Sequence, residues 1–137
     1  MDVLVDASAI LAVLLNEQGR SAITAQTENA TLLAPETLPF EIANALTSLY
    51  RKKKITGEEL AAAYRNYALI PLRSVKADPE NALKIACKYK ISAFEAYYLE
   101  IAYRLKISLI TFSVSMKKAA LNMKIKIPAK PAKGGKP

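Results

Sequence analysis

The stretch VLVDASAI, residues 3–10, decides the fold class. Residues 3–5 form a short β-branched apolar run, which predicts a buried strand. The segment Asp-Ala-Ser interrupts this run, and residues 9–15 then follow a pattern that is typical of a helix. Asp6 therefore stands where the carboxyl end of a strand passes into the start of a helix. In open α/β sheets this edge is where ligands bind.

The same alternation of strand and helix continues along the chain. Further strands are predicted at residues 31–34, 70–75, 108–112 and 124–127. Helices are predicted at residues 19–29, 40–51, 56–68, 78–89, 92–105 and 113–122. This alternation predicts a three-layer α/β/α domain with a mainly parallel central sheet. We expect the domain to span residues 1–127. Residues 128–137 lack apolar anchors and are expected to form a disordered basic tail.

The composition excludes several kinds of site. The 137 residues contain no histidine and one cysteine, which excludes His-dependent catalysis, His-ligated zinc and a disulfide framework. Only four glycines are present, so a Rossmann or P-loop nucleotide site lacks its main support. The chemistry must therefore use carboxylates, hydroxyls, amides, lysines or a metal held by oxygen. The cysteine, Cys87, lies on a helical apolar pattern and is expected in the core.

The positive charge is concentrated in the last quarter of the chain. Residues 101–137 contain nine Lys and Arg and no acid, whereas residues 1–100 contain eleven basic and twelve acidic residues. A basic region of this kind predicts an anionic partner, nucleic acid before membrane. The alternative is a solvated region that keeps the protein soluble. No apolar run is long enough for a transmembrane helix, and the N-terminus lacks a basic signal region. We therefore expect no membrane association and a cytoplasmic location.

Three acidic residues stand in apolar surroundings and are candidates for chemistry. Asp6 follows the first strand, with a helix N-cap as its structural alternative. Glu41 shares one face of an apolar helical segment with Asn44, and its alternative is to stabilise the helix dipole from the first turn. Glu95 follows Ser92 at the spacing of a capping box, which is a strong structural alternative.

Carboxylates that meet in one pocket repel one another. A Mg²⁺ or Mn²⁺ ion between them relieves the repulsion and supplies a Lewis acid. Such a metal can activate water and stabilise an in-line displacement at a phosphodiester without histidine. A basic region on the same chain would attract the polyanionic substrate.

Four segments resemble, in order, the motifs of PIN domains, and most closely those of the VapC-like toxin ribonucleases of toxin–antitoxin pairs. The segments are VLVDASAI (3–10), EIANAL (41–46), ISAFEAYYL (91–99) and LITFS (109–113), and the resemblance covers roughly residues 1–127. It implies a metal-dependent endoribonuclease that cleaves RNA with water activated by Mg²⁺ or Mn²⁺. It also implies the toxin of a type II pair with an antitoxin protein partner, and it makes a homodimer plausible.

The resemblance also assigns roles to particular residues. Asp6, Glu41 and Glu95 are similar to the first three acids of the family, which implies that they are catalytic and bind the metal. Ser8 resembles the small hydroxyl residue that supports the first acid. Asn44 resembles the amide that accompanies the second.

Two positions depart from the family pattern. The third acid is usually Asp, whereas Glu95 is one methylene longer, and the fourth position is usually Asp, whereas this chain has Ser113. Metal affinity is expected to fall, because hard cations prefer charged oxygen. Glu17 and Glu100 are the candidates for compensation, although a surface position is expected for each. Glu100 should also face another side of its helix, some 140° from Glu95.

Four aromatic side chains accompany the proposed cleft and offer stacking surfaces for bases. Their helical spacing favours core or interface positions instead. They are Phe94, Tyr97, Tyr98 and Tyr103.

Two functional interpretations of different kinds remain. The first is the ribonuclease, favoured by Asp6 and Glu41. The second is a catalytically weakened PIN-like scaffold that binds RNA or a protein partner, favoured by Ser113. A receiver-type phosphoacceptor is a more distant option, because the expected acidic pair is missing beside residues 3–6.

Overall fold

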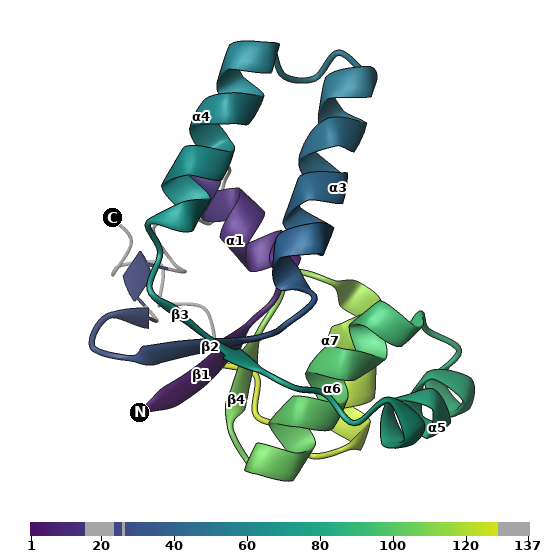
Figure 1. Ribbon diagram of the computed structural model, residues 1–137. Coiled ribbons are helices and arrows are strands. Elements are labelled where there is room, and N and C mark those ends of the chain that lie inside the picture. Colours follow the sequence, from purple (N-terminus) through teal and green to yellow (C-terminus); the bar gives the residue numbers. More distant parts are fainter. Residues whose placement is uncertain (16–23, 26, 129–137) are drawn as a thin grey trace, which may run out of the picture.

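A computed structural model of the chain describes residues 1–15, 24–25 and 27–128. Its centre is a parallel four-stranded sheet in the order β3-β2-β1-β4 (Figure 1). The strands are β1 (Asp2–Val5), β2 (Thr31–Pro35), β3 (Leu72–Val75) and β4 (Ser108–Ile110). The helices are α1 (Ala7–Leu14), α3 (Leu38–Arg51), α4 (Gly57–Ala68), α5 (Pro79–Tyr89), α6 (Ala93–Leu105) and α7 (Val114–Asn122). The predicted three-layer α/β/α architecture is confirmed.

Helices cover both faces of the sheet, and β1, its central strand, is apolar on both faces from Val3 to Val5 for this reason. Side chains point alternately to the two sides of a strand, so Val3 and Val5 face one layer and Leu4 faces the other. The first layer packs against α1, α3 and α4, and the second packs against α6 and α7. Val3, Leu4 and Val5 are each at most 1% exposed.

The sheet order places a topological switch beside β1. The chain runs from β1 to β2 on one side, whereas β4, the last strand in sequence, pairs with β1 on the other side. The backbone N–H of Asp6 extends this second pairing by donating to the carbonyl of Ile110 at 3.2 Å. The carboxyl ends of β1 and β4 therefore lie at the type of crevice where open α/β sheets bind ligands.

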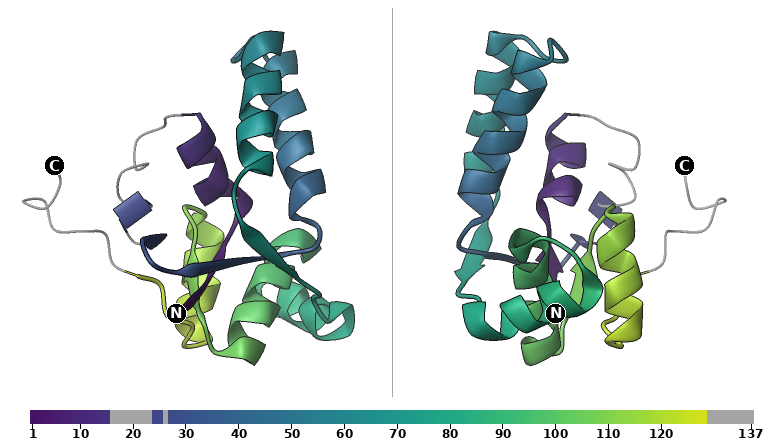
Figure 2. Two further views of the ribbon diagram at one scale, coloured as in Figure 1. Left: turned by 60° about the vertical axis from the view of Figure 1, so that its left-hand side comes forward. Right: turned by 90° about the vertical axis from the view of Figure 1, so that its right-hand side faces the viewer.

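Local signals explain where the helices begin. Thr56 and Glu59 form the predicted capping box at α4, with reciprocal bonds of 3.0 and 2.8 Å. Asp78 caps α5, and Pro79 follows at its first position, as expected. Helices α3 and α4 form a hairpin that projects away from the sheet (Figure 2).

Two sequence-based predictions are wrong. Residues 124–127 do not form an edge strand, because their one backbone bond to β4 is the 3.0 Å bond from Leu109 N–H to the Lys126 carbonyl. Cys87 is exposed rather than part of the core. Helix α5 buries Ala82 and Ala86, and the next position along the helix turns away from that face.

Other predictions fall on residues outside the described ranges. The predicted helix at residues 19–29 lies largely there, as does Glu17. Residues 129–137 of the predicted tail also lie outside, so the tail stays a prediction. Among the described residues, no helix has both the length and the apolar character needed to cross a bilayer.

Candidate active site

Asp6 lies at the carboxyl end of β1 with 4% of its surface exposed. It caps α1, and its Oδ1 accepts the Ala9 N–H at 3.0 Å, so the predicted capping role is real. The same oxygen accepts the Ser8 hydroxyl at 2.7 Å. The other oxygen, Oδ2, accepts the Thr111 hydroxyl. A carboxylate with this many donors is fixed in orientation.

Thr111 was missed by the sequence analysis as a residue of this site. It follows β4, is 4% exposed, and lies 105 residues from its partner Asp6. Its oxygen also accepts the backbone N–H of Ser113 at 2.9 Å. The Ser8 hydroxyl oxygen accepts the N–H of Phe112 at 2.9 Å. The segment after β4 is therefore tied to Asp6 and to its neighbour Ser8.

Glu41 is half-buried in the first turn of α3. Its Oε2 accepts the Thr37 hydroxyl at 2.8 Å, and its Oε1 accepts the Tyr98 hydroxyl at 3.1 Å. Tyr98 comes from α6 and is 2% exposed. Helices from both sides of the sheet thus hold this carboxylate. Thr37 and Tyr98 were also not predicted as partners of the acid.

The pKa values of Asp6 and Glu41 are both raised. Burial raises the pKa of Asp6 above its usual range, against the opposing effect of its hydrogen bonds from Thr111, Ala9 and Ser8. Burial also raises the pKa of Glu41, and the nearby negative charge of Asp6 adds to that rise. The Tyr98 hydroxyl has a raised pKa from burial and from the same two carboxylates. The structure therefore brings Asp6 and Glu41 close enough to interact.

Glu95 is held in a different way. Its Oε2 accepts the hydroxyls of Ser113 and Ser115, each at 3.0 Å. Ser92 caps α6 by accepting the N–H of Glu95, which is half of the predicted capping box, while the carboxylate turns toward the two serines. Glu95 and Ser113 are therefore brought together.

Ser8 and Asn44 differ in how they relate to the acids. Ser8 contacts Asp6 directly, as described above. Asn44 is exposed, and within the described ranges its side chain forms no hydrogen bond. The amide expected beside Glu41 is thus on the same helix but is not bonded to it.

Asp6 and Glu41 together offer the carboxylate oxygens that a hard divalent cation prefers. Mg²⁺ is usually held by one or two carboxylates and by water, and the repulsion between Asp6 and Glu41 is what a cation would relieve. Within the described part of the chain, no three acidic or Cys side chains lie close enough to hold one metal ion. Glu95 as a third metal ligand therefore stays a prediction.

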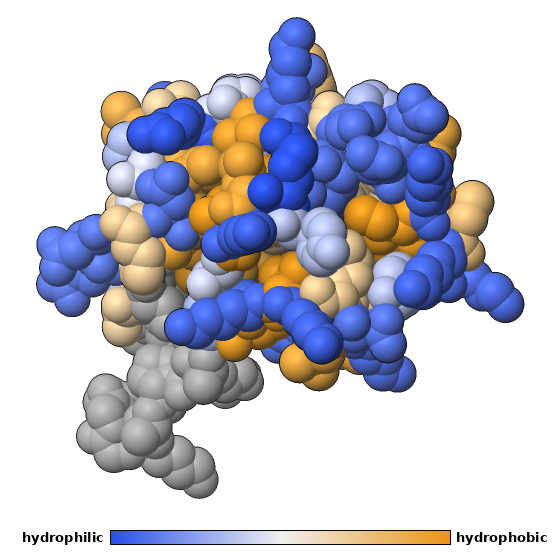
Figure 3. Space-filling model, turned by 90° about the horizontal axis from the view of Figure 1, so that it is seen from below, coloured by the Kyte–Doolittle hydropathy of each residue, from blue (hydrophilic) through white to orange (hydrophobic). Residues whose placement is uncertain are grey.

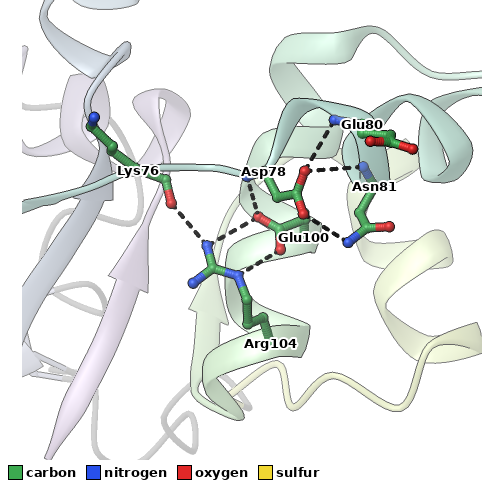
Figure 4. Close-up of polar contacts among 6 residues, drawn as sticks. All are labelled: Lys76, Asp78, Glu80, Asn81, Glu100 and Arg104. Carbon is green, nitrogen blue, oxygen red and sulfur yellow. Dashed lines mark hydrogen bonds and ion pairs between the residues drawn. The ribbon is translucent and has the colours of Figure 1, made fainter.

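Glu100 does not compensate for the missing fourth acid. It is 4% exposed, so the expectation of a surface position is wrong, whereas the expectation that it faces elsewhere is right. Its carboxylate pairs with Arg104 at 2.7 Å and accepts the Asp78 N–H at 2.8 Å (Figure 4). Arg104 also donates to the carbonyl of Lys76 at 2.8 Å. This network fastens the loop after β3 onto α6.

The four aromatic residues divide into two groups. Tyr98 is in the core, as expected, and Tyr97 is half-buried. Phe94 and Tyr103 are 53% and 61% exposed, so neither lies in the core, and an interface position for them stays a prediction. Phe94 packs edge-on against Tyr97, with ring centroids 5.8 Å apart.

Comparison with known proteins shows which of them share the fold of this chain. The model of the PIN domain family matches residues 3–121. The structure of PAE2754 from Pyrobaculum aerophilum is similar with a TM-score of 0.68 and 18% identity, covering 87% of this chain and 79% of that one. No curated protein matches the sequence.

Two toxin-related structures are also similar in fold. VapC20 from Mycobacterium tuberculosis, described as a Sarcin-Ricin loop cleaving toxin, has a TM-score of 0.67 and 14% identity, covering 94% of this chain and 99% of that one. VapBC2 from Rickettsia felis, solved bound to a DNA fragment from its promoter, has a TM-score of 0.64 and 10% identity, covering 96% and 100%.

Proposed function

The chain belongs to the PIN domain family, and from this premise we propose that it is a metal-dependent endoribonuclease acting as the toxin of a type II toxin–antitoxin pair. Family membership supports a nuclease. The observation that carries the proposal is a pair of neighbouring carboxylates at the switch point of the sheet, buried Asp6 and half-buried Glu41, in which the charge of Asp6 raises the pKa of Glu41. Two carboxylates this close repel each other when both are charged, and a bound divalent cation would relieve that repulsion.

The residues of this chain would hold and orient the reacting groups. Asp6 and Glu41 would bind Mg²⁺ or Mn²⁺, and Glu95 is proposed as the third acid. The bound cation would supply positive charge to polarise the phosphodiester and to assist attack by water. Ser8 and Thr111 fix Asp6, and Thr37 and Tyr98 fix Glu41, so that neither carboxylate has to reorganise during the reaction.

The partners follow from the same proposal. RNA is proposed as the substrate on the resemblance to VapC-like toxins and on the basic residues 101–137. An antitoxin protein and a homodimer are proposed on that resemblance.

The test is RNA cleavage by the purified protein with Mn²⁺ or Mg²⁺. We expect Asp6→Asn to reduce cleavage to background, because it removes one negative ligand from the pair. Asp2→Asn is the matched control, since Asp2 is exposed at the other end of the same strand, and it should leave cleavage unchanged. Absence of cleavage by the wild-type protein with either metal would contradict the proposal.

A second candidate function is favoured by the contacts of Glu95. Both the neutral Ser113 and the use of Glu95 Oε2 by two serine hydroxyls support a PIN-like scaffold with weakened catalysis that binds RNA or a protein. Metal binding separates the two candidates. Millimolar Mg²⁺ or Mn²⁺ should raise the Tm of the nuclease by mass action, because the folded protein binds the ion better than the unfolded chain does. An unchanged Tm together with RNA binding would favour the scaffold.

A further inference from the structure

A cavity of about 420 Å³ lies at the end of the sheet opposite to Asp6. It is lined by the end of α6, the start of β4 and the segment that follows α7. Because the strands are parallel, the start of β4 and the carboxyl end of β1 lie at opposite ends of the strands. Figure 3 shows the underside of the molecule, where apolar surface lies among long hydrophilic side chains.

The cavity is positively charged. Lys106, Lys124 and Lys126 line it, and no acidic residue does. None of the three forms an ion pair with a described residue. Helices α6 and α7 both end here, and each helix end carries about half a negative charge. Three full positive charges outweigh these two partial charges, so the cavity attracts anions.

Backbone hydrogen bonds hold the cavity walls in place. Lys106 and Lys124 both adopt left-handed backbone conformations, with φ of 56° and 62°. Lys106 is the C-cap of α6, and Lys124 follows Met123, the C-cap of α7. The following residues are fixed by the bond from Ile107 N–H to the Ala102 carbonyl at 3.1 Å and by the bond from Ile125 N–H to the Ala120 carbonyl at 2.8 Å. The bond from Leu109 N–H to the carbonyl of Lys126 closes the third side. The backbone of the cavity walls would therefore need little ordering on binding.

An aromatic ring accompanies the lysines. Tyr103 lines the cavity and is 61% exposed, so its ring is accessible to a ligand. Lysines bind phosphates, and aromatic rings stack with bases irrespective of sequence. An acidic peptide would satisfy the lysines but not the ring.

We propose that this cavity is a second nucleic-acid contact, which binds a single-stranded segment of RNA outside the cleavage site. The lysines hold the phosphates and Tyr103 stacks one base. The choice of RNA rests on the proposed function. This contact lets the protein hold the RNA at a distance from the phosphodiester that would be cleaved beside Asp6. It does not require a metal.

The test measures binding of fluorescein-labelled oligouridine of about 12 nucleotides by anisotropy, with metals chelated. The variant carries Lys106→Asn, Lys124→Asn and Lys126→Gln, because asparagine tolerates the left-handed backbone. We expect binding at least about tenfold weaker and a log–log salt slope smaller by about 2. Tyr103→Ala should weaken binding without changing the slope, and Tyr103→Phe should not weaken it.

A matched control removes the same charge elsewhere. Lys52→Gln, Lys53→Asn and Lys54→Gln lie at the end of α3, and Lys53 has the same left-handed backbone, with φ of 59°. An equal loss of binding in this control would overturn the proposal in favour of diffuse attraction. If polyglutamate displaces the oligouridine equally well from the wild type and from Tyr103→Ala, the proposal is overturned in favour of an acidic protein partner. Should the triple variant unfold, Lys126→Gln alone must still reduce the salt slope. Cleavage assays report separately on the proposed function, since no metal is present here.

Discussion

Hydroxyl donors and burial have opposite effects on the pKa values of the two acids, Asp6 and Glu41. Each carboxylate of the pair accepts at least one side-chain hydroxyl from a distant part of the chain, Thr111 for Asp6 and Tyr98 for Glu41. These bonds favour the charged forms, whereas burial opposes them. Burial is the larger effect for both residues, and this balance leads to two predictions.

The first prediction concerns pH. Because the folded-state pKa of Asp6 is raised, its contribution to stability is fully present below its unfolded pKa and is lost as pH rises through its folded pKa. With metals chelated, the free energy of unfolding of the wild type should therefore fall relative to Asp6→Asn over the pH range that begins at the ordinary Asp pKa of about 4. Urea titrations of both proteins measure the difference. A difference that stays constant over this range would contradict the raised pKa.

The second prediction concerns Tyr98 as a positioning residue. Tyr98→Phe removes the hydroxyl that donates to Glu41 and keeps the buried ring. We expect RNA cleavage to fall about tenfold and the acid limb of its pH profile to move to higher pH, because the charged carboxylate loses a donor. Tyr97→Phe, at the adjacent half-buried position, is the control. Equal pH profiles for the two variants would show that the Tyr98 hydroxyl has no such role.

Among the elements, α6 connects the site to the rest of the fold. Glu95 and Tyr98 face the candidate site, and Glu100 fastens the loop between β3 and α5. The helix therefore has a functional end and a structural end. Glu100 is the key residue of the structural end because its carboxylate accepts hydrogen bonds from both a partly buried backbone N–H and a guanidinium (Figure 4).

The third prediction is that Glu100→Ala lowers the free energy of unfolding by about 3 kcal/mol. The substitution leaves the Asp78 N–H without its acceptor and Arg104 without its partner. Glu80→Ala, at an exposed position of α5, should change stability by no more than about 0.5 kcal/mol. Urea denaturation measures both values. A similar small change in the two variants would show that the network contributes little.

The elements follow closely from sequence patterns, whereas the partners of the site residues do not. Capping signals and apolar periods predict α4 and α5 because these signals are local. Thr111 was not predicted as a site residue because a β-branched residue is ordinary beside a strand and because its partner Asp6 lies 105 residues away. Glu100 was misplaced for the same reason, since its backbone partner is 22 residues distant.

Other errors arise from tertiary packing. Cys87 matches a helical apolar period, yet α5 is only partly covered and leaves it exposed. Residues 124–127 alternate like a strand but make a single ladder bond, because the chain has just turned at Lys124 with φ of 62°.

For the whole molecule, charge is distributed unevenly between the two ends of the sequence. The fourth prediction is that deletion of residues 128–137 weakens RNA binding and reduces the log–log salt slope by about 2, because it removes three lysines. Replacement of these lysines by glutamine at constant length is the control and should reproduce the loss. Thermal melting should be unchanged by either alteration. An unchanged salt slope would indicate that these residues serve only solubility.

The pairing of β4 with β1 has a consequence for the order of assembly. These neighbours in the sheet come from opposite ends of the chain, and the bond between Thr111 and Asp6 closes a loop of 105 residues. Contacts of such high sequence separation form late, after the loop entropy has been overcome. An incompletely synthesised polypeptide would contain both principal acids but not the strand that orients the first. The candidate site would thus be completed in one step, when β4 pairs with β1, and it would be disrupted whenever β4 dissociates from the sheet.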